Sequence, residues 1–126
     1  MSERYITAQV RTYSSGTPGR ALCSARTNHF VADDLASHGH GGPGEALNAA
    51  ELFLSGITAC AVLMMERLAR ASSLPLQRAD VTMEGSIDTE AVREGPPVLD
   101  RAHMQFTLVG LTNAQAKELV ETYKRR

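Results

Sequence analysis

The longest apolar stretch of the chain, residues 52–65, contains no charged side chain. Its apolar residues fall on all sides of a helix, and the alanine, leucine and methionine that dominate it are strong helix formers. Asn48 precedes the stretch as a good N-cap, and Glu51 follows three residues later, as in a capping box. The pattern predicts one long helix over residues 48–72.

A helix that is apolar on every side lies in a protein core or in a membrane. The uncharged run is shorter than the ~18 to 20 residues needed to span a bilayer, so we expect residues 48–72 to form a buried core helix. The N-terminal residues MSERYITAQVR lack the apolar segment of a signal peptide. We therefore expect a cytoplasmic protein without a membrane partner.

A strand-like alternation of apolar and polar residues precedes the long helix. Residues 5–13 and 20–26 flank a turn with the sequence SSGTPG, and residues 28–33 form a third candidate strand. This pattern predicts a small antiparallel sheet within residues 1–34. Residues 35–47 are rich in glycine and have no apolar period, which predicts a loop that leads into the helix.

Strand-like alternation returns after the long helix. Pro75 ends the helix, and the alternating residues 77–88 and 99–109 are separated by a charged, proline-bearing connection. This arrangement predicts a second antiparallel pair of strands within residues 77–110.

The end of the chain has the pattern of a second helix. Thr112 and Gln115 have the spacing of a capping box, which predicts a helix over residues 112–126. Because strands and helices stand in separate blocks, the predicted class is α+β with antiparallel sheets. The length fits a single domain over residues 1–126.

Charge and cysteine content narrow the range of possible functions. A formal net charge of -1, from 13 Lys and Arg against 14 Asp and Glu, gives no general attraction to nucleic acid. Two cysteines are too few for a disulfide framework. The second of them, Cys60, lies far inside the long helix, without a nearby cation or helix N-terminus to activate it. From residue type alone Cys60 is a small buried hydrophobe, and any activation must come from elsewhere in the fold.

Other residues give weaker chemical signals. Cys23 shares a strand face with alanines, so we expect it to pack in the sheet and not to resolve an oxidised thiol. His38 and His40 lie in the glycine-rich loop without further ligands at a recognisable spacing, so no metal or cofactor is predicted. His29 and His103 lie on predicted strands and are expected at the surface.

A family resemblance gives Cys60 more weight. The string GPGEALNAAELFLSGITAC resembles the OsmC/Ohr superfamily, in which a glycine-rich loop leads into a long central helix and a peroxide-reacting cysteine follows an acidic residue by nine or ten positions. Glu51 and Cys60 have this spacing. The string FTLVGLTNAQAKELVETYKRR also resembles the family's last strand and helix.

The resemblance implies a fold and an activity. It implies antiparallel sheets wrapped around the central helix, in an intertwined homodimer with two active sites at the subunit interface. It also implies a cofactor-free, thiol-dependent peroxidase that reduces organic hydroperoxides or hydrogen peroxide in oxidative-stress defence. Cys60 would become a sulfenic acid, with Glu51 as its acidic partner, and a dithiol reductant such as dihydrolipoamide would restore the thiol.

The chain departs from the family pattern at three places. Ala49 stands where the family has a proline. The family's organic-hydroperoxide branch has an arginine in the first hairpin turn; Thr17 is near the aligned position, and Arg20, a few residues later, is the candidate cation. The family's second cysteine would follow at about Arg126. Either the native chain continues to this cysteine or an external thiol resolves the sulfenic acid.

The spacing of Glu51 and Cys60 has a geometric consequence. Nine residues on one helix correspond to about 13.5 Å and roughly 180° around the axis, so the two side chains cannot meet on one helix. A second copy of the helix would have to supply one of them, while Glu51 also serves as a cap. The alternative is a non-enzymatic dimeric domain that binds a small apolar ligand and keeps Cys60 buried.

Overall fold

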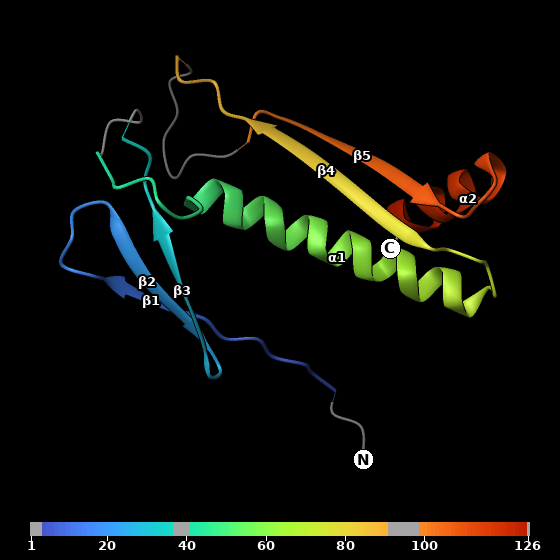
Figure 1. Cartoon of the computed structure of the whole chain (residues 1–126), viewed down its shortest axis with the longest axis horizontal. Helices are drawn as coiled ribbons and strands as arrows, with labels where there is room; N and C mark the ends of the chain where they lie inside the picture. The colour runs from blue at the N-terminus through green and yellow to red at the C-terminus, as the bar shows by residue number, and fades with distance from the viewer. Residues whose placement is uncertain (1–3, 37–40, 91–98, 126) are drawn as a thin grey trace. The chain divides into compact units, whose positions relative to one another are not determined.

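The computed structural model describes residues 4–36, 41–90 and 99–125 (Figure 1). Three strands are followed by a long helix, two strands and a second helix, and all strand pairs are antiparallel. The predicted α+β class is therefore confirmed. The chain divides into two compact units, Met1–Phe53 and Leu54–Arg126, which are called the N-terminal unit and the C-terminal unit below. The single domain over residues 1–126 stays a prediction.

A three-stranded antiparallel sheet forms most of the N-terminal unit. Its strands are β1 (Arg11–Ser14), β2 (Arg20–Ala25) and β3 (Asn28–Asp33), and they lie in the order β1-β2-β3. A two-residue turn joins β2 to β3, and Arg26 within it has a φ of 56°. The tight turn fixes the register, which places Arg20 opposite Asp33.

The first strand is shorter than the sequence predicted. Residues 5–10 alternate like a strand, but β1 begins only at Arg11. The physical reason lies in β2: Ser24 pairs with Arg11, and the chain turns directly after Ala25. Residues before Arg11 therefore have no neighbouring strand in this sheet with which to form a ladder. Tyr5 and Ile6 are left 70% and 98% exposed.

The long helix α1 spans Ala49–Ala71, close to the predicted residues 48–72. The Glu51 backbone N–H donates to Asn48 Oδ1 at 2.8 Å, and the Asn48 N–H donates to Glu51 Oε1 at 2.9 Å. The predicted capping box is thus confirmed.

The C-terminal unit contains a two-stranded sheet and the second helix. Strands β4 (Arg78–Ser86) and β5 (Arg101–Val109) pair along their whole length, as the alternation predicted. Helix α2 (Asn113–Lys124) starts after Thr112, whose hydroxyl accepts from the Gln115 N–H at 3.2 Å. This second capping box was also predicted correctly.

The core of the C-terminal unit lies between α1, the sheet and α2. Met65, Ala69 and Leu119 are 0%, 2% and 5% exposed. Partly buried apolar side chains pack against them: Leu68, Leu74, Leu76, Ala79, Phe106, Leu108, Leu111, Val120 and Tyr123. This cluster holds the second half of α1 in place, because burial of apolar surface is the main favourable term in folding.

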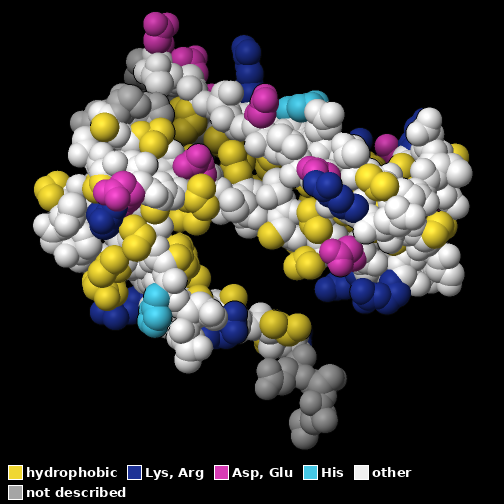
Figure 2. Space-filling model, in the orientation of Figure 1, with side chains coloured by type: hydrophobic (Ala, Val, Ile, Leu, Met, Phe, Trp, Pro, Cys, Tyr) yellow, Lys and Arg dark blue, Asp and Glu magenta, His cyan; other side chains and the backbone are white. Residues whose placement is uncertain are grey.

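The all-round burial predicted for α1 is wrong for the chain by itself. Only Ala61, Met65 and Ala69 are buried on α1, while Phe53 and Leu63 are 61% and 59% exposed. Hydrophobic side chains are visible at the molecular surface in Figure 2. The sequence shows that α1 is apolar on every side, but the chain covers only one side of it.

By length and composition alone, α1 would also be able to cross a membrane, and it is the one helix of the described ranges for which this holds. The core helices of soluble proteins can have the same length and apolar composition.

Candidate functional site

Cys60 lies on the uncovered side of α1. With about 100° of rotation per residue, Gly56, Cys60 and Leu63 fall within roughly 60° of one another around the helix axis, and all three are exposed. The buried Ala61 and Met65 lie around the axis toward the opposite side. The expected burial of Cys60 is therefore wrong for the single chain, in which the thiol is exposed. An exposed thiol can meet a substrate or a second protein chain.

Glu51 does not share a site with Cys60 on one helix. Its carboxylate accepts from the Asn48 N–H in the first turn of α1 and is exposed. Cys60 follows nine residues later on the same helix, so the two side chains extend from opposite sides of α1. The capping role of Glu51 is visible in the structure, and its role next to a thiol stays a prediction.

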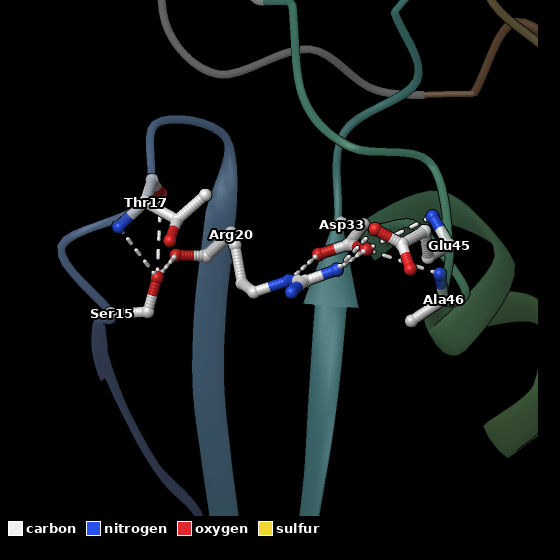
Figure 3. A network of polar contacts seen from close by, with 6 residues as sticks. All are labelled: Ser15, Thr17, Arg20, Asp33, Glu45 and Ala46. Atoms are coloured by element: carbon white, nitrogen blue, oxygen red, sulfur yellow. Dashed lines mark hydrogen bonds and ion pairs between the residues drawn. The ribbon is translucent and has the colours of Figure 1, made fainter.

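Arg20 forms a two-pronged ion pair with Asp33 (Figure 3). Its Nε donates to Asp33 Oδ1 at 2.7 Å, and its Nη2 donates to Asp33 Oδ2 at 2.8 Å. Glu45 Oε1 lies 3.5 Å from the same Nη2. The Arg20 side chain is 27% exposed, whereas that of Asp33 is completely buried. Parallel N–H···O bonds of this kind are among the strongest polar contacts in proteins.

The pair shifts both titration equilibria toward the charged forms. The hydrogen bonds from Arg20 hold the pKa of Asp33 below its usual range, and the backbone N–H groups of Glu45 and Ala46 act in the same direction against the effect of burial. The hydrogen bond to Asp33 raises the pKa of Arg20 above its usual value. Arg20 is therefore a permanent cation whose charge is balanced by an adjacent carboxylate.

Asp33 is the polar residue of this site that the sequence analysis missed. It is the one charged residue of the described ranges that is completely buried. One signal was present: once the turn at residues 26–27 is placed, counting back along β2 and β3 puts Arg20 opposite Asp33. Opposite charges at facing positions of two strands attract each other.

The turn between β1 and β2 contains Thr17, the residue near the position of the arginine that the resemblance implies. Ser15 orders this turn: its hydroxyl donates to the Arg20 carbonyl at 2.9 Å and accepts from the Thr17 N–H at 3.0 Å (Figure 3). Residues 15–19 include no arginine. The turn therefore offers a hydroxyl group at this place and no cation.

The other cysteine and the histidines of the described ranges form no hydrogen bond or ion pair with Arg20 or Asp33. Cys23 is 6% exposed in the middle of β2, in agreement with a packing role. His29 and His103 are exposed, while His38 and His40 lie outside the described residues. Within the described ranges, no three His, Cys, Asp or Glu side chains gather closely enough to hold a metal ion.

Sequence comparison identifies the family. The model of the OsmC family, described as OsmC-like protein, matches residues 42–126. The chain belongs to the OsmC-like family. The matched segment includes the loop before α1, the whole of α1 with Glu51 and Cys60, and all that follows. No curated protein matches the chain.

Solved structures of OsmC-like proteins have the same fold. An OsmC like protein from Mycoplasma pneumoniae superposes with a TM-score of 0.79 at 15% identity, over 96% of this chain and 82% of that one. An organic hydroperoxide resistance protein OsmC from Legionella pneumophila gives 0.72 at 21% identity, over 94% and 82%.

A third structure is somewhat closer in sequence. It is a Vibrio cholerae protein assigned provisionally to organic hydroperoxide resistance, with captopril bound in one of its active sites. Its TM-score is 0.60 at 26% identity, and the match covers 97% of this chain and 79% of that chain.

Proposed function

We propose that this OsmC-like protein is a thiol-dependent peroxidase that reduces organic hydroperoxides or hydrogen peroxide and serves in oxidative-stress defence. The observation that carries the proposal is the exposed thiol of Cys60 on the uncovered side of α1. It lies within the segment that matches the family. Two similar structures are named for organic hydroperoxide resistance, which supports a peroxide as substrate.

The proposed reaction begins at the sulfur of Cys60. The thiolate attacks one peroxide oxygen, so that an S–O bond forms while the O–O bond breaks, and the departing alkoxide or hydroxide takes a proton and leaves as the alcohol or as water. The sulfur is oxidised by two electrons to a sulfenic acid. One thiol of a dithiol reductant, such as one of the lipoyl type, then attacks the sulfenic sulfur and displaces water, which forms a mixed disulfide. Its second thiol releases Cys60 and leaves the reductant as a disulfide.

A homodimer completes this proposal. Gly56, Cys60 and Leu63 form an exposed stripe with a spacing of four and three residues, and such stripes pack against a second helix in coiled coils. A second copy of the chain would cover the stripe, and the first turn of its α1 would supply the acidic partner of Cys60 that the resemblance implies. The close approach is possible because Gly56 has no side chain and Cys60 has a small one.

Gly56 allows the dimer to be tested separately from the fold. A Cβ at this position meets no atom within 4 Å in the chain, and replacing glycine in a helix interior stabilises the helix by up to about 1 kcal/mol. Gly56→Leu should therefore keep the chain folded and prevent close helix packing. We expect a dimer for the wild-type protein and a monomer for Gly56→Leu by analytical ultracentrifugation at micromolar concentration.

Gly56→Ala is the matched control, because its methyl group adds little volume to the helix surface. It should remain dimeric and be at least as stable as the wild type. A wild-type protein that sediments as a monomer, or a Gly56→Leu variant that dimerises as tightly as wild type, would be incompatible with a site shared between two α1 helices.

Turnover tests the proposed activity. Pre-reduced protein is mixed with cumene hydroperoxide or hydrogen peroxide and with dihydrolipoamide, and loss of the peroxide is followed over time. We expect catalytic consumption of peroxide with one disulfide of the reductant formed per peroxide consumed. Consumption no faster than in dihydrolipoamide alone would reject the peroxidase.

The alternative of a non-enzymatic binding domain requires a sealed Cys60. In the single chain the thiol is exposed, and turnover with a peroxide distinguishes the two functions. A cytoplasmic location remains part of the proposal, since a reducing compartment would keep Cys60 reduced between turnovers.

A further inference from the structure

We propose that Arg20 and Asp33 form a clamp that holds the loop before α1, and that Arg20 supports the Cys60 site as a positioning residue and not as the cation beside the thiolate. The inference rests on the proposed peroxidase for its kinetic part. Its structural part concerns only the N-terminal unit, in which all the contacts below lie. We call residues 41–47 the pre-helix loop.

Asp33 connects three segments of the chain through one buried carboxylate. Its Oδ1 accepts from Arg20 Nε, and its Oδ2 accepts from Arg20 Nη2, from the Glu45 N–H at 3.0 Å and from the Ala46 N–H at 3.1 Å. The Asp33 backbone N–H also donates to the Leu47 carbonyl at 3.0 Å. A buried carboxylate with this many donors fixes the groups around it, because each lost partner would leave a polar group unpaired away from water.

A second attachment holds the beginning of the pre-helix loop. Gly42 is buried, and a Cβ on Gly19 would lie 2.4 Å from the Gly42 Cα. A Cβ on Gly42 would in turn overlap the backbone of Asp34, whose N–H donates to the Gly19 carbonyl at 2.8 Å. Gly19 has a φ of 77°, which glycine adopts most readily. Backbone contact at Gly42 and the carboxylate of Asp33 therefore attach the loop at both ends.

The clamp acts directly on the start of α1. Leu47, which accepts from the Asp33 N–H, is followed by Asn48, the N-cap that exchanges hydrogen bonds with Glu51. The contacts thus run without a gap from Arg20 through Asp33 to the first turn of α1. In the proposed dimer this turn supplies the acidic partner of Cys60, so a shift of the loop would displace that carboxylate from the thiol.

The charges around Arg20 argue against a direct role as the thiolate's cation. Two N–H groups of its guanidinium are used by Asp33, and Glu45 approaches Nη2 as well. An arginine paired with a carboxylate at hydrogen-bond distance offers a thiolate far less net attraction than a free cation does. Its fixed, two-pronged geometry suits positioning, which a lysine cannot reproduce.

The test compares Arg20→Gln, Arg20→Lys, Asp33→Asn and the double variant Arg20→Gln/Asp33→Asn. If the clamp positions the site, each single variant, including Arg20→Lys, loses roughly tenfold in peroxidase kcat, since small displacements of catalytic groups are costly. The double variant should recover part of the loss, because two neutral amides can bond to each other. Amide hydrogen exchange of Glu45 and Ala46 should become faster in the single variants.

A second readout separates positioning from direct charge stabilisation. The rate of Cys60 alkylation by iodoacetamide is measured against pH, and the clamp predicts that the midpoint does not rise in Arg20→Gln relative to wild type, because no cation beside the thiolate is lost. A midpoint that moves upward in Arg20→Gln but is retained in Arg20→Lys would identify Arg20 as the thiolate's cation and overturn the inference. An unchanged kcat in all variants, measured well below their unfolding temperatures, would show that the clamp only stabilises the fold. This result would also overturn the inference that it positions the Cys60 site.

The controls distinguish this inference from the proposed function. Arg11→Gln changes an exposed arginine of the same sheet, whose guanidinium lies 4.5 Å from the Tyr13 ring centroid, and should behave as wild type. If the wild-type protein shows no peroxidase activity, the proposed function fails and the positioning role fails with it. Amide exchange at Glu45 and Ala46 tests the clamp independently of any activity. Wild-type protection of both amides in Asp33→Asn would show that the clamp does not exist.

Discussion

Replacing Cys60 with serine is expected to abolish hydroperoxide reduction. A serine hydroxyl has nearly the volume of the thiol, but it does not react with peroxides as a thiolate does. Because the covalent step depends on this one sulfur, we expect the rate to fall by roughly 10³-fold or more, to the background of the reductant alone. Peroxide consumption at a fixed dihydrolipoamide concentration measures the loss.

The other cysteine provides the matched control for Cys60→Ser. Cys23 is buried in β2 between strands β1 and β3, so Cys23→Ala removes a thiol without reaching the proposed site. It should retain the wild-type rate. Retained activity in Cys60→Ser, or an equal loss in Cys23→Ala, would show that the peroxide reacts elsewhere.

The second large effect is expected from Met65→Ala. Met65 is 0% exposed and belongs to the buried cluster with Ala69 and Leu119. Deleting a fully buried methionine side chain removes its transfer free energy and leaves a cavity, so the free energy of unfolding should fall by about 2 to 5 kcal/mol. Urea denaturation followed by circular dichroism measures it.

Val109→Ala is the control for the loss of packing. Val109 is at the end of β5 and is 44% exposed, so its truncation should cost about 1 kcal/mol or less. Equal losses in the two variants would contradict the position of the core between α1, the sheet and α2.

Local signals in the sequence were enough to predict the elements. The capping boxes at Asn48 and Thr112 use partners three residues apart, so both helix starts could be predicted. The same holds for β4 and β5, because half-buried and exposed residues alternate along most of each strand. Interactions between residues close in the sequence determine these elements.

Features that depend on distant partners could not be predicted. Residues 5–10 alternate like a strand, yet a strand also needs a neighbour, and β2 ends too early to provide one. The apolar period of α1 likewise does not say which side other elements cover, so the exposure of Cys60 followed only from the structure. Asp33 required the register of β2 and β3 before its pairing with Arg20 could be seen.

The family resemblance predicted only some features of the candidate site. It selected Cys60 and Glu51 by their spacing, and the family membership of residues 42–126 is confirmed. It also pointed to Arg20 as a cation for the thiolate, whereas the structure shows this guanidinium bound to Asp33. The contacts of a side chain therefore have to be known before its role is transferred between relatives.

The proposed reaction of Cys60 with hydroperoxides can be observed in a single-turnover experiment. Pre-reduced protein is mixed with one equivalent of cumene hydroperoxide and dimedone, and each cysteine is followed by mass spectrometry. We expect a dimedone adduct on Cys60, with one cumyl alcohol released per thiol, long before free cysteine at the same concentration reacts. Oxidation of Cys60 no faster than that of free cysteine would contradict the proposed reaction.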